Sequence, residues 1–431
     1  MRLVKRSPWL MGLGVLLAGL VTAPGARGDV TSDESGTLII FPKVVSDGVR
    51  DTLIQLSNRT NSFVQVHCFY INASGTCSLT TEQSCEDDAD CPENEQCDRQ
   101  CNATNFELAL TAQQPVQWRV STGRLTTIPS APCRPGQPCQ CTLDTSGRLV
   151  CPGMLIGQNN ALFVPPMGSQ FVGELKCYQT NAGDPYPGNA LKGTATIEHL
   201  GSAQISEYNA LTVAANADPQ NNLITDKELR LNWTGLGDGE LNYCPESLVF
   251  TANAEGVTDA FTGATISTEL TLVPCSELIE EDLPAPVRVR FVGYNELEQQ
   301  VSIEAFRFDC FLNRRLADLP VSGGGIFVSG NGDLWKIRIS PLPVNVCYSG
   351  SNRGASCTQD SDCGDNVLTG PADTRLGCLP ASGVLGVAEE FYTVPGMPSF
   401  LDGTAAFNLR HEGRRSGFGD IVTLPTLPTL P

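Results

Sequence analysis

The sequence predicts an all-β protein built from two tandem antiparallel β-sandwich domains with disulfide-rich loop inserts. Three observations support this fold class. Short stretches rich in β-branched and aromatic residues recur along the 431 residues, and almost no stretch has a sustained helical period. Turn signals separate these stretches roughly every 8–12 residues, a spacing typical of sandwiches. The strand-like signals also recur in the second half of the chain, so two domains are expected.

Seven stretches carry the strand prediction, because they alternate between apolar and polar residues or are enriched in β-branched and aromatic ones. They are residues 51–56, 63–69, 116–120, 194–197, 287–291, 301–308 and 335–339. Clusters of Asn, Gly, Pro and Asp lie between them, as at residues 184–189 and 235–239, and predict turns. Residues 207–265 are harder to assign, and we expect them to add strands to the second domain.

Six weak signals recur in the same order in the two halves, which indicates a tandem duplication. In the first half they are residues 37–42, 49–58, 68–72, 118–120, 172–178 and 193–195. Their counterparts are residues 271–274, 287–295, 310–313, 335–337, 385–392 and 403–405. The alternative is one large β-sheet protein whose strands look alike only because strands in general use the same residue types. The Phe41-Pro42 opening, followed by a Leu/Ile strand that ends in Asn58, resembles the start of many immunoglobulin-like domains, which implies the fold alone.

The predicted organisation has four parts. Residues 1–28 are a signal peptide. Residues 29–206 are the first β-sandwich domain, with Cys-rich inserts at residues 73–104 and 131–153. Residues 207–415 are the second β-sandwich domain, with a Cys-rich insert at residues 346–380. Residues 416–431 are an extended Pro-rich tail, because a Thr-Leu-Pro unit repeats there.

The N-terminus has the layout of a secretory signal peptide. Three basic residues between Arg2 and Arg6 precede the apolar run 10–21, and Ala26 and Gly28 follow at the spacing of a cleavage site. The run of twelve residues is shorter than the ~20 apolar residues of a membrane span. We therefore expect an exported protein of the periplasm, cell surface or extracellular medium, with no membrane span.

The charge of the exported chain limits its partners. Removal of residues 1–28 leaves 24 Lys and Arg against 47 Asp and Glu, a formal net charge of −23 compared with −19 for the whole chain. Such acidity repels phosphate backbones and anionic membranes, so nucleic acid is not expected as a partner. The expected partner is an unknown protein or glycan at the cell surface.

All 18 cysteines lie after residue 28, and no Cys-x-x-Cys motif occurs. The chain has only 3 His, too few to support several zinc sites with mixed Cys and His ligands. Disulfides are therefore favoured over metal binding. The disulfide candidates form three clusters and a dispersed set: Cys77, Cys85, Cys91, Cys97 and Cys101; Cys133, Cys139, Cys141 and Cys151; Cys347, Cys357, Cys363 and Cys378; and Cys68, Cys177, Cys244, Cys275 and Cys310.

The number of cysteines is odd in each half, with 11 up to Cys177 and 7 after it. Complete oxidation therefore requires at least one bridge between the halves or one to a partner chain. We expect a bridge between the halves that is drawn from the dispersed set. Cys244 and Cys275 are candidates to pair with each other.

Residues 84–91 and 356–363 share the pattern Ser-Cys-x-x-Asp-x-Asp-Cys. The favoured interpretation is a tight turn, in which Asp side chains accept hydrogen bonds from the local backbone and the cysteines fix the loop. The alternative is calcium binding through paired carboxylates, although the additional ligands and the Gly of an EF-hand loop are absent. The four candidate calcium ligands are Asp88, Asp90, Asp360 and Asp362.

Part of the first signature is similar to the whey acidic protein four-disulfide core. The matching residues are Cys85, Asp88, Asp90, Cys91, Pro92 and Cys97. That family has adjacent cysteines after this point, whereas Asp98 follows Cys97 here, so protease inhibition is not carried over. Residues 269–275, 347–363 and 385–391 resemble segments of uncharacterised exported Cys-rich β-proteins of Gram-negative bacteria, deltaproteobacterial types especially. This second resemblance implies an export route but no activity.

No catalytic or cofactor-binding residue is predicted. The sequence contains no nucleophile elbow, zincin helix, P-loop or dinucleotide fingerprint. His67, His199 and His411 are expected to be structural or solvated, the last two as equivalent residues after the Gly-Thr-Ala signals. The acidic runs Glu389-Glu390 and 280–282 are expected to be solvated, although a carboxylate-dependent hydrolase would use such pairs.

Three functions remain open. The leading interpretation is a non-enzymatic, exported structural or adhesive protein of the envelope or cell surface. The second is a protein- or glycan-binding module that acts through its Cys-rich loops. The third is a secreted hydrolase that uses carboxylates. None of them requires a cofactor, and calcium at the Asp pairs is the one metal considered.

Overall fold

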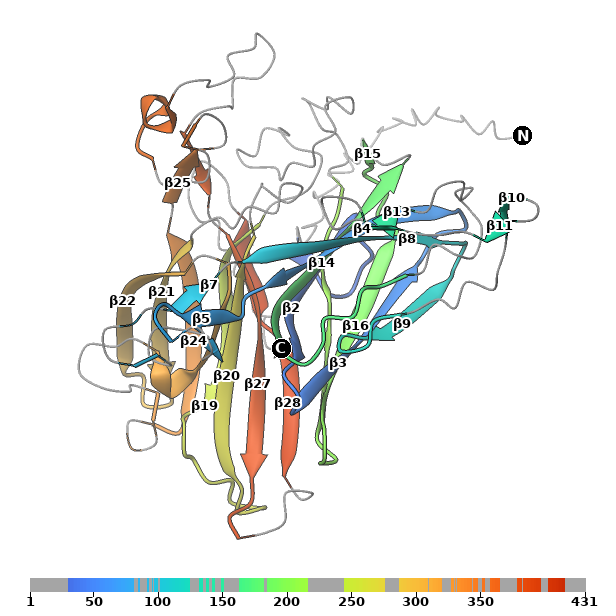
Figure 1. The fold of residues 1–431 in the computed structure, drawn as a ribbon. Coiled ribbons are helices and arrows are strands. Elements are labelled where there is room, and N and C mark those ends of the chain that lie inside the picture. Colours follow the sequence, from blue (N-terminus) through green and yellow to red (C-terminus); the bar gives the residue numbers. More distant parts are fainter. Residues whose placement is uncertain are drawn as a thin grey trace, which may run out of the picture.

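The computed structural model is almost entirely β in the residues that it describes, and its sheets are antiparallel (Figure 1). The described residues are 30–80, 84–85, 91–92, 95, 97–99, 101–124, 132–134, 137–138, 142–143, 149–150, 163–181, 184–215, 244–275, 287–308, 310–319, 327–328, 330, 332–342, 344–347, 351–352, 357–364, 378–381, 383–396 and 402–414. The expected signal peptide and Pro-rich tail lie outside them. The prediction of an all-β chain is confirmed, since these residues contain no α-helix.

Eleven strands of the first half form one branched sheet, whose main path is β17-β16-β3-β2-β14-β4-β8. β9 pairs with β3, β15 pairs with β14, and β18 pairs with both β1 and β2. Their bounds are β1 Val30–Thr31, β2 Leu38–Ser46, β3 Arg50–Asn58, β4 Val64–Asn72, β8 Asn102–Leu110, β9 Pro115–Arg119, β14 Phe171–Asn181, β15 Asp184–Pro185, β16 Leu191–His199, β17 Ile205–Asn209 and β18 Leu211–Val213.

Strand β2 is the most deeply placed strand of this half, since all nine of its residues are buried. Ile39 and Phe41 belong to one hydrophobic cluster, whereas Leu38 and Ile40 belong to another on the opposite face of the strand. A strand that is covered on both faces is a nearly continuous apolar run rather than an alternating one. This explains why β2 reads as Leu-Ile-Ile-Phe-Pro-Lys-Val-Val-Ser.

The core of the first half contains a buried polar pair. The indole Nε1 of Trp118 donates a hydrogen bond of 2.6 Å to the hydroxyl oxygen of Tyr70. Phe106 packs between the two rings, edge-on to Trp118 and tilted against Tyr70. Burial raises the pKa of the Tyr70 hydroxyl, so this group is neutral at physiological pH.

Tyr70→Phe removes the acceptor and leaves the Trp118 N–H buried without a partner. We expect the free energy of unfolding to fall by about 1–3 kcal/mol, which is the typical cost of an unsatisfied buried donor. Urea unfolding followed by tryptophan fluorescence measures this change. Tyr186→Phe is the control, because Tyr186 is 44% exposed. Equal stability of the two variants would contradict a role for the buried hydrogen bond.

Nine strands of the second half form two further sheets, with the orders β22-β21-β24-β19-β29 and β23-β20-β27-β28. Their bounds are β19 Pro245–Asn253, β20 Thr265–Pro274, β21 Val287–Asn295, β22 Gln300–Phe308, β23 Leu312–Arg315, β24 Leu334–Leu342, β27 Val384–Thr393, β28 Gly403–Asn408 and β29 Arg410–Arg414, and the 3-10 turn η2 is Leu316–Asp318. One hydrophobic cluster collects side chains from both sheets, among them Phe291, Phe327 and Trp335.

The seven predicted strand stretches all coincide with strands of these sheets. The predicted boundary after residue 206 is wrong, because it falls inside β17. Strands β17 and β18 pair with β16 and β2, so the first sheet continues to Val213. Strand β19, from the segment that was hard to assign, joins the second half as expected.

The strand pairings agree only in part with the six recurring sequence signals. The first and fifth signals pair with each other in both halves, as β2 with β14 and as β20 with β27. The second and fourth also pair in both halves, as β3 with β9 and as β21 with β24. The third signal differs, because β4 pairs with β14 whereas its counterpart β23 pairs with β20. The duplication therefore stays a hypothesis.

The Cys-rich inserts form small separate sheets. The first insert is the sheet β6-β5-β7, and the third is the hairpin β25-β26 with the 3-10 turn η3. The second contains the hairpins β10-β11 and β12-β13. Their bounds are β5 Gly75–Cys77, β6 Ser84–Cys85, β7 Cys97–Arg99, β10 Pro132–Arg134, β11 Gln137–Pro138, β12 Thr142–Leu143, β13 Leu149–Val150, β25 Val344–Cys347, β26 Cys378–Ala381 and η3 Asp360–Cys363.

Candidate functional site

The main chemical feature of the structure is a buried charge cluster where the two halves meet. Strand β2 of the first half contacts β20 and β27 of the second, and β17 lies beside β28. Figure 1 shows this junction near the centre, with β2 next to β27 and β28. One hydrophobic cluster also crosses the junction, since it contains Val45 and Phe69 together with Val273 and Leu385.

Lys43 enters this junction from a β-bulge in β2. The pairing of β2 with β14 shifts register between Phe41 and Val44, so Pro42 and Lys43 stand opposite a single residue of β14. Proline has no N–H to give to a sheet, and bulges of this kind redirect a side chain. The backbone of Lys43 bonds instead to Tyr208, whose hydroxyl donates to the Lys43 carbonyl at 2.5 Å and accepts from the Lys43 N–H at 3.1 Å.

The ammonium group of Lys43 binds two carboxylates of the other half. Its Nζ contacts Glu269 on β20 and lies 2.7 Å from Oε2 of Glu389 on β27. Both Lys43 and Glu389 are fully buried. Ser206 on β17 donates a further hydrogen bond of 2.6 Å to Oε1 of Glu389. The first half therefore supplies a cation and a hydroxyl donor, and the second half supplies both carboxylates.

Arg50 adds a second cation at the edge of the cluster. Its Nη1 lies 3.4 Å from Oε1 of Glu269, and its Nε donates to Asp47 at 2.9 Å. Asp47 also accepts hydrogen bonds from the backbone N–H groups of Val49 and Arg50, which forms the turn between β2 and β3. This turn fixes the backbone position of Arg50, and the guanidinium group extends from it to the second half.

The cluster keeps its charges despite burial. Burial would lower the pKa of Lys43, but attraction from Glu269 and Glu389 outweighs it and holds this pKa above its usual value. Burial would also raise the pKa of both carboxyls, yet Lys43 holds the pKa of Glu389 well below its usual range. Lys43 and Arg50 together lower the pKa of Glu269. All four groups are therefore ionised at physiological pH, and none is poised to donate or take a proton.

These findings bear on the two acidic runs of the sequence. The expectation that Glu389-Glu390 is a solvated run is wrong, since Glu389 is 0% and Glu390 is 9% exposed. Glu390 instead accepts a hydrogen bond of 2.8 Å from the Tyr392 hydroxyl. The other acidic run, residues 280–282, lies outside the described residues.

The three histidines have different surroundings. His67 contacts Asn105 at 3.1 Å within the first half. His199 lies 3.9 Å from Oε1 of Glu389, and Nδ1 of His411 lies 2.9 Å from the Val30 carbonyl oxygen. His199 and His411 therefore both face the opposite half, but they are not equivalent, since one ends β16 and the other is the second residue of β29.

The disulfides confirm the expected oxidation and the bridge between the halves. Cys310 pairs with Cys101 across the junction, over a sequence separation of 209 residues. The expectation that this bridge is drawn from the dispersed set is right for Cys310 and wrong for Cys101, which belongs to the first loop cluster in the sequence. The other described pairs are Cys68–Cys177, Cys77–Cys91, Cys244–Cys275, Cys347–Cys363 and Cys357–Cys378. Cys85 is also disulfide-bonded. Cys139, Cys141 and Cys151 and the side chains of Cys97 and Cys133 lie outside the described part.

The two inserts that carry the repeated signature share one local design. Cys77 stands opposite Cys97 in β5 and β7, as Cys347 stands opposite Cys378 in β25 and β26. In each insert the first cysteine is bonded to the cysteine that ends the signature, namely Cys91 or Cys363.

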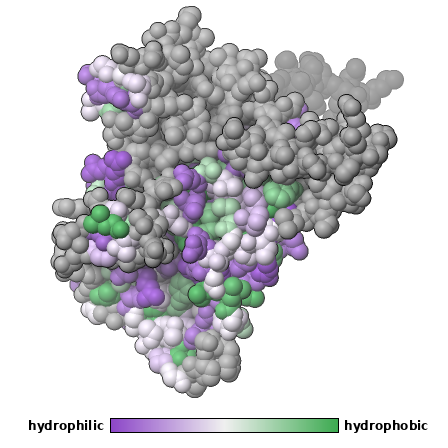
Figure 2. Space-filling view, viewed as in Figure 1, coloured by the Kyte–Doolittle hydropathy of each residue, from purple (hydrophilic) through white to green (hydrophobic). Residues whose placement is uncertain are grey.

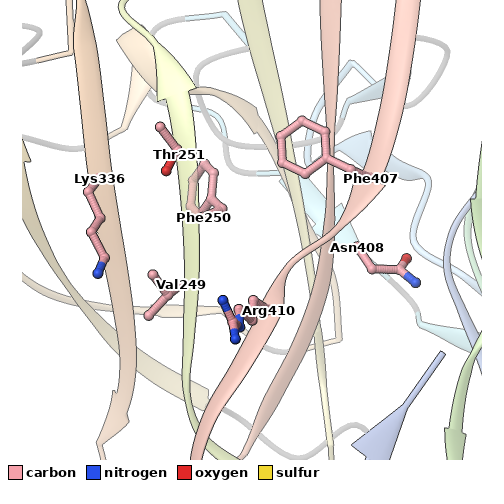
Figure 3. Close-up of a pocket in the computed structure, with 7 residues that line it drawn as sticks. All are labelled: Val249, Phe250, Thr251, Lys336, Phe407, Asn408 and Arg410. Atoms are coloured by element: carbon pink, nitrogen blue, oxygen red, sulfur yellow. The ribbon is translucent and has the colours of Figure 1, made fainter. Parts of the chain in front are cut away.

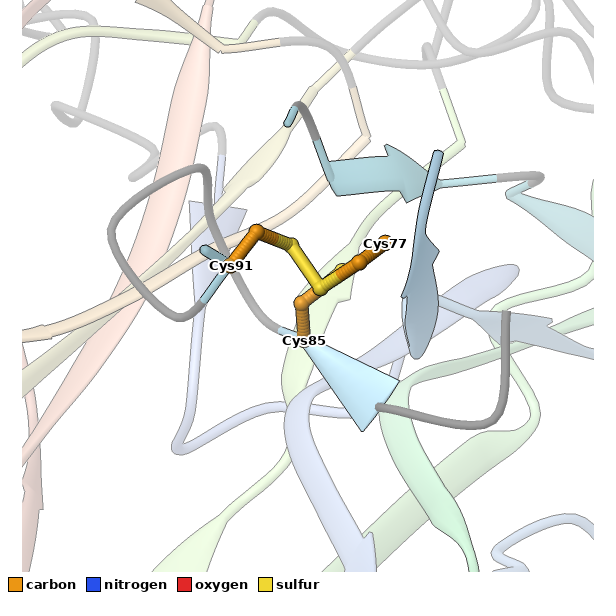
Figure 4. A group of neighbouring side chains, drawn as sticks. All are labelled: Cys77, Cys85 and Cys91. Atoms are coloured by element: carbon orange, nitrogen blue, oxygen red, sulfur yellow. A yellow bond between two sulfur atoms is a disulfide. The ribbon is translucent and has the colours of Figure 1, made fainter. Parts of the chain in front are cut away.

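Each of these inserts also brings three cysteine sulfurs within 4.8 Å of one another, and Figure 4 shows the first group. The groups are Cys77, Cys85 and Cys91, and Cys347, Cys357 and Cys363. All six are disulfide-bonded, so none is available as a thiolate ligand. We therefore describe both groups as disulfide clusters.

Asp362 holds the turn of the third insert together. Its Oδ2 accepts hydrogen bonds from the backbone N–H and the hydroxyl of Thr358, both at 2.8 Å, and from the backbone N–H of Gln359 at 3.2 Å. These donors lower the pKa of the carboxyl. The carboxylate thus serves as the acceptor in a tight turn, as the favoured interpretation expects. Asp88 and Asp90 and the side chain of Asp360 lie outside the described part of the chain.

Asp362→Ala removes these three hydrogen bonds and is expected to loosen the turn. The neighbouring bridge Cys347–Cys363 should then be reduced severalfold faster by dithiothreitol at pH 7, because local opening exposes it. Mass spectrometry of alkylated peptides measures this rate. The lowered pKa means that the carboxylate contribution is present above about pH 3.8 and is lost as the pH falls. Ser361→Ala is the control, and an equal rate in both variants would contradict the role of Asp362.

Among the coloured residues of Figure 2, hydrophobic ones form small groups between hydrophilic ones. Single exposed apolar side chains such as Phe261 and Leu79 are ordinary on protein surfaces. No helix in the described residues is long and apolar enough to cross a membrane. The sequence matches no protein-family model and no curated protein.

Lys43 is the residue of the cluster that sequence reasoning missed. Its signal was a single charged residue inside the apolar run Leu38–Val45, next to a proline. A charge in such a run indicates a buried partner, since an unpaired buried charge is too costly to persist. The partners, Glu269 and Glu389, lie 226 and 346 residues away in the sequence, so the sequence alone could not identify them.

Proposed function

We propose that this protein is an exported structural or adhesive component of the envelope or cell surface, without catalytic activity. Its two halves would each be a β-sandwich of the immunoglobulin-like kind. The single observation that carries the proposal is the junction, which combines a disulfide, a shared hydrophobic cluster and a buried ion cluster. Such a junction holds two domains as one rigid body, which suits a component that bears load or presents surfaces at a fixed angle.

The chemistry of the junction supports a mechanical rather than a catalytic role. Glu269 and Glu389 are the two carboxylates that meet at the junction. Lys43 sequesters both of them, and neither has the raised pKa of a general acid. The hydrolase alternative therefore gains no support from this pair of carboxylates.

A binding module that acts through the Cys-rich loops is the alternative function. The observation in its favour is that the first and third inserts share a design and are held by bridges of their own. Figure 1 shows the third insert, with β25, beyond the ends of the long strands of the second half. Deletion of residues 346–380 separates the two functions, because loss of partner capture with unchanged thermal unfolding would favour the loop-binding alternative.

The proposal is tested by locating the chain in a Gram-negative host. Expression of the full sequence should give a protein that lacks residues 1–28, is released with the periplasm or cleaved by protease on intact cells, and contains no free thiol. A chain made without residues 1–28 is the control and should stay in the cytoplasm. Retention of the full-length chain in the cytoplasm with reduced cysteines would overturn the proposal.

A further inference from the structure

The outer face of the sheet β22-β21-β24-β19-β29 concentrates basic side chains in an otherwise acidic protein. The inner face of this sheet packs on the core of the second half, so alternate residues point outward. Six basic residues occupy outward positions: Arg288, Arg290, Arg307, Lys336, Arg338 and Arg410. They are six of the 24 basic residues that follow residue 28. We call this surface the basic face.

Strand register places the basic residues on four of the five strands, and β19 contributes Val249 between two of them. Arg288 stands directly opposite Arg307 on β22. Val249 on β19 lies between Arg338 on β24 and Arg410 on β29, so these two cations flank one apolar side chain. Like charges on neighbouring strands repel and cost stability, so a face of this kind is better matched by an anion than by water alone.

Among the described side chains, acidic neighbours leave much of the face without ion pairs. Four of its members form no ion pair in the described part of the chain: Arg288, Arg290, Lys336 and Arg410. Glu296 lies in the turn after β21, where its carboxylate accepts hydrogen bonds from the backbone N–H groups of Asp333 and Leu334. Glu304 and Glu412 belong to β22 and β29, and their side chains are outside the described set.

A pocket of about 550 Å³ lies at one edge of the basic face. β29 pairs with β19 only from Pro245 to Val249, because the chain crosses from β28 to β29 at Leu409 and leaves the rest of this β19 edge unpaired. Figure 3 shows Lys336 and Arg410 on either side of Val249, with Phe407 and Asn408 on the opposite strand. The lining thus combines two cations, the aromatic rings of Phe250 and Phe407, an amide and the hydroxyl of Thr251.

We propose that the basic face binds an acidic polysaccharide whose sugars carry carboxylates, and that the pocket receives one of these sugars. The carboxylate would lie between Lys336 and Arg410, and the ring of the sugar against Phe407. Arginine recognises carboxylates through paired N–H groups, and the Thr251 hydroxyl suits sugar hydroxyls. This proposal goes beyond the structural function, which rests on the junction and needs no ligand on this face.

Charge density favours a polysaccharide over a nucleic acid. Duplex DNA carries one negative charge per about 1.7 Å, which the remaining acidic surface of a chain of net charge −19 repels strongly. A polysaccharide with one carboxylate per sugar is less densely charged. Screening over a Debye length of about 8 Å at physiological salt lets the basic face act locally despite the net charge.

The test is binding of the mature, oxidised protein to immobilised polygalacturonate at low and high salt. Arg290→Gln/Lys336→Gln should weaken binding about tenfold at low salt, since each exposed ion pair contributes up to about fivefold. Arg59→Gln/Arg315→Gln removes the same charge from exposed sites off the basic face and should bind like the wild type. Free galacturonate should compete for the wild-type site.

Four outcomes would overturn this proposal. They are no binding of the wild type to polygalacturonate, equal loss in both double variants, equal binding to uncharged dextran, and tighter binding to single-stranded DNA or to anionic vesicles. Thermal unfolding of each variant shows whether a loss reflects misfolding instead of lost contacts. Cell fractionation tests the structural proposal independently, so failure of one proposal is distinguishable from failure of the other.

Discussion

Lys43→Met lowers the free energy of unfolding by about 3–5 kcal/mol, which is the cost of removing one partner from a buried ion pair. The variant leaves the carboxylates of Glu269 and Glu389 in the buried junction without the ammonium group that they share, and only Glu269 keeps a second cation, Arg50. Methionine retains most of the volume and the flexible stem of lysine, so the loss reports on charge more than on packing. Urea unfolding measured by fluorescence and circular dichroism provides the comparison.

Two further variants separate the effect of leaving a charge unpaired from the effect of burying it. Lys43→Met/Glu269→Gln/Glu389→Gln removes all three charges, and we expect it to recover most of the lost stability, since neutral replacements of buried ion clusters are often tolerated. Arg119→Met breaks an ion pair with Glu198 whose arginine side chain is 42% exposed, and it should cost no more than about 1 kcal/mol. If Lys43→Met lowered the free energy of unfolding by no more than Arg119→Met does, the result would contradict a stabilising role for the buried cluster.

The cluster also sets the direction of the response to pH. The folded pKa values of Glu269 and Glu389 are depressed, so their stabilisation is complete above the usual glutamate value of about 4.5 and is lost as the pH falls below it. The pKa of Lys43 is raised, so its contribution persists to about pH 10.5 and is lost only at higher pH. Acid should therefore weaken the wild type more than the triple neutral variant.

Cys101→Ser/Cys310→Ser should destabilise the protein by up to about 5 kcal/mol. In the chain-entropy model this value follows from the 209-residue separation of the two cysteines, because a bridge over so long a loop strongly reduces the conformational entropy of the unfolded chain. The variant also frees the two halves to move at the junction. Unfolding by urea under non-oxidising conditions should then resolve two transitions in place of one.

Cys357→Ser/Cys378→Ser is the matched control for this bridge. It removes a disulfide that spans only 21 residues and lies inside the third insert. The long strands do not depend on that insert, so we expect their unfolding transition to be unchanged. A loss in Cys101→Ser/Cys310→Ser that did not exceed the control would show that the bridge between the halves adds little to the junction.

The sequence predicted the strands better than it predicted their partners. Alternation identifies β3, β9 and β24 because each has one face on a core and one toward solvent. β2 lacks this alternation because both of its faces are covered, and its bulge at Pro42 depends on pairing with β14. Local patterns report burial, whereas pairing across hundreds of residues depends on the assembled fold.

The odd number of cysteines in each half correctly indicated a covalent link at the junction, whereas local residue patterns did not reveal the contacts there. Counting needs no geometry, so the odd numbers in the halves predicted a bridge between them, with a bridge to a partner chain as the alternative. The sequence did not single out Cys101 as one end of this bridge, because Cys101 is close in sequence to the loop cysteines. It begins the segment that leads into β8, which places it beside Phe311 and Cys310 in the shared hydrophobic cluster.

The bridge between Cys101 and Cys310 has a consequence for biosynthesis. A ribosome makes Cys101 209 residues before its partner, while several other thiols of the first insert are already present. Oxidation in order of appearance would therefore trap Cys101 with a neighbour. Thiol–disulfide exchange can release it later, through attack by a thiolate on the wrong bridge. Production of the native protein should accordingly depend on a disulfide isomerase, and an oxidant alone should give scrambled chains.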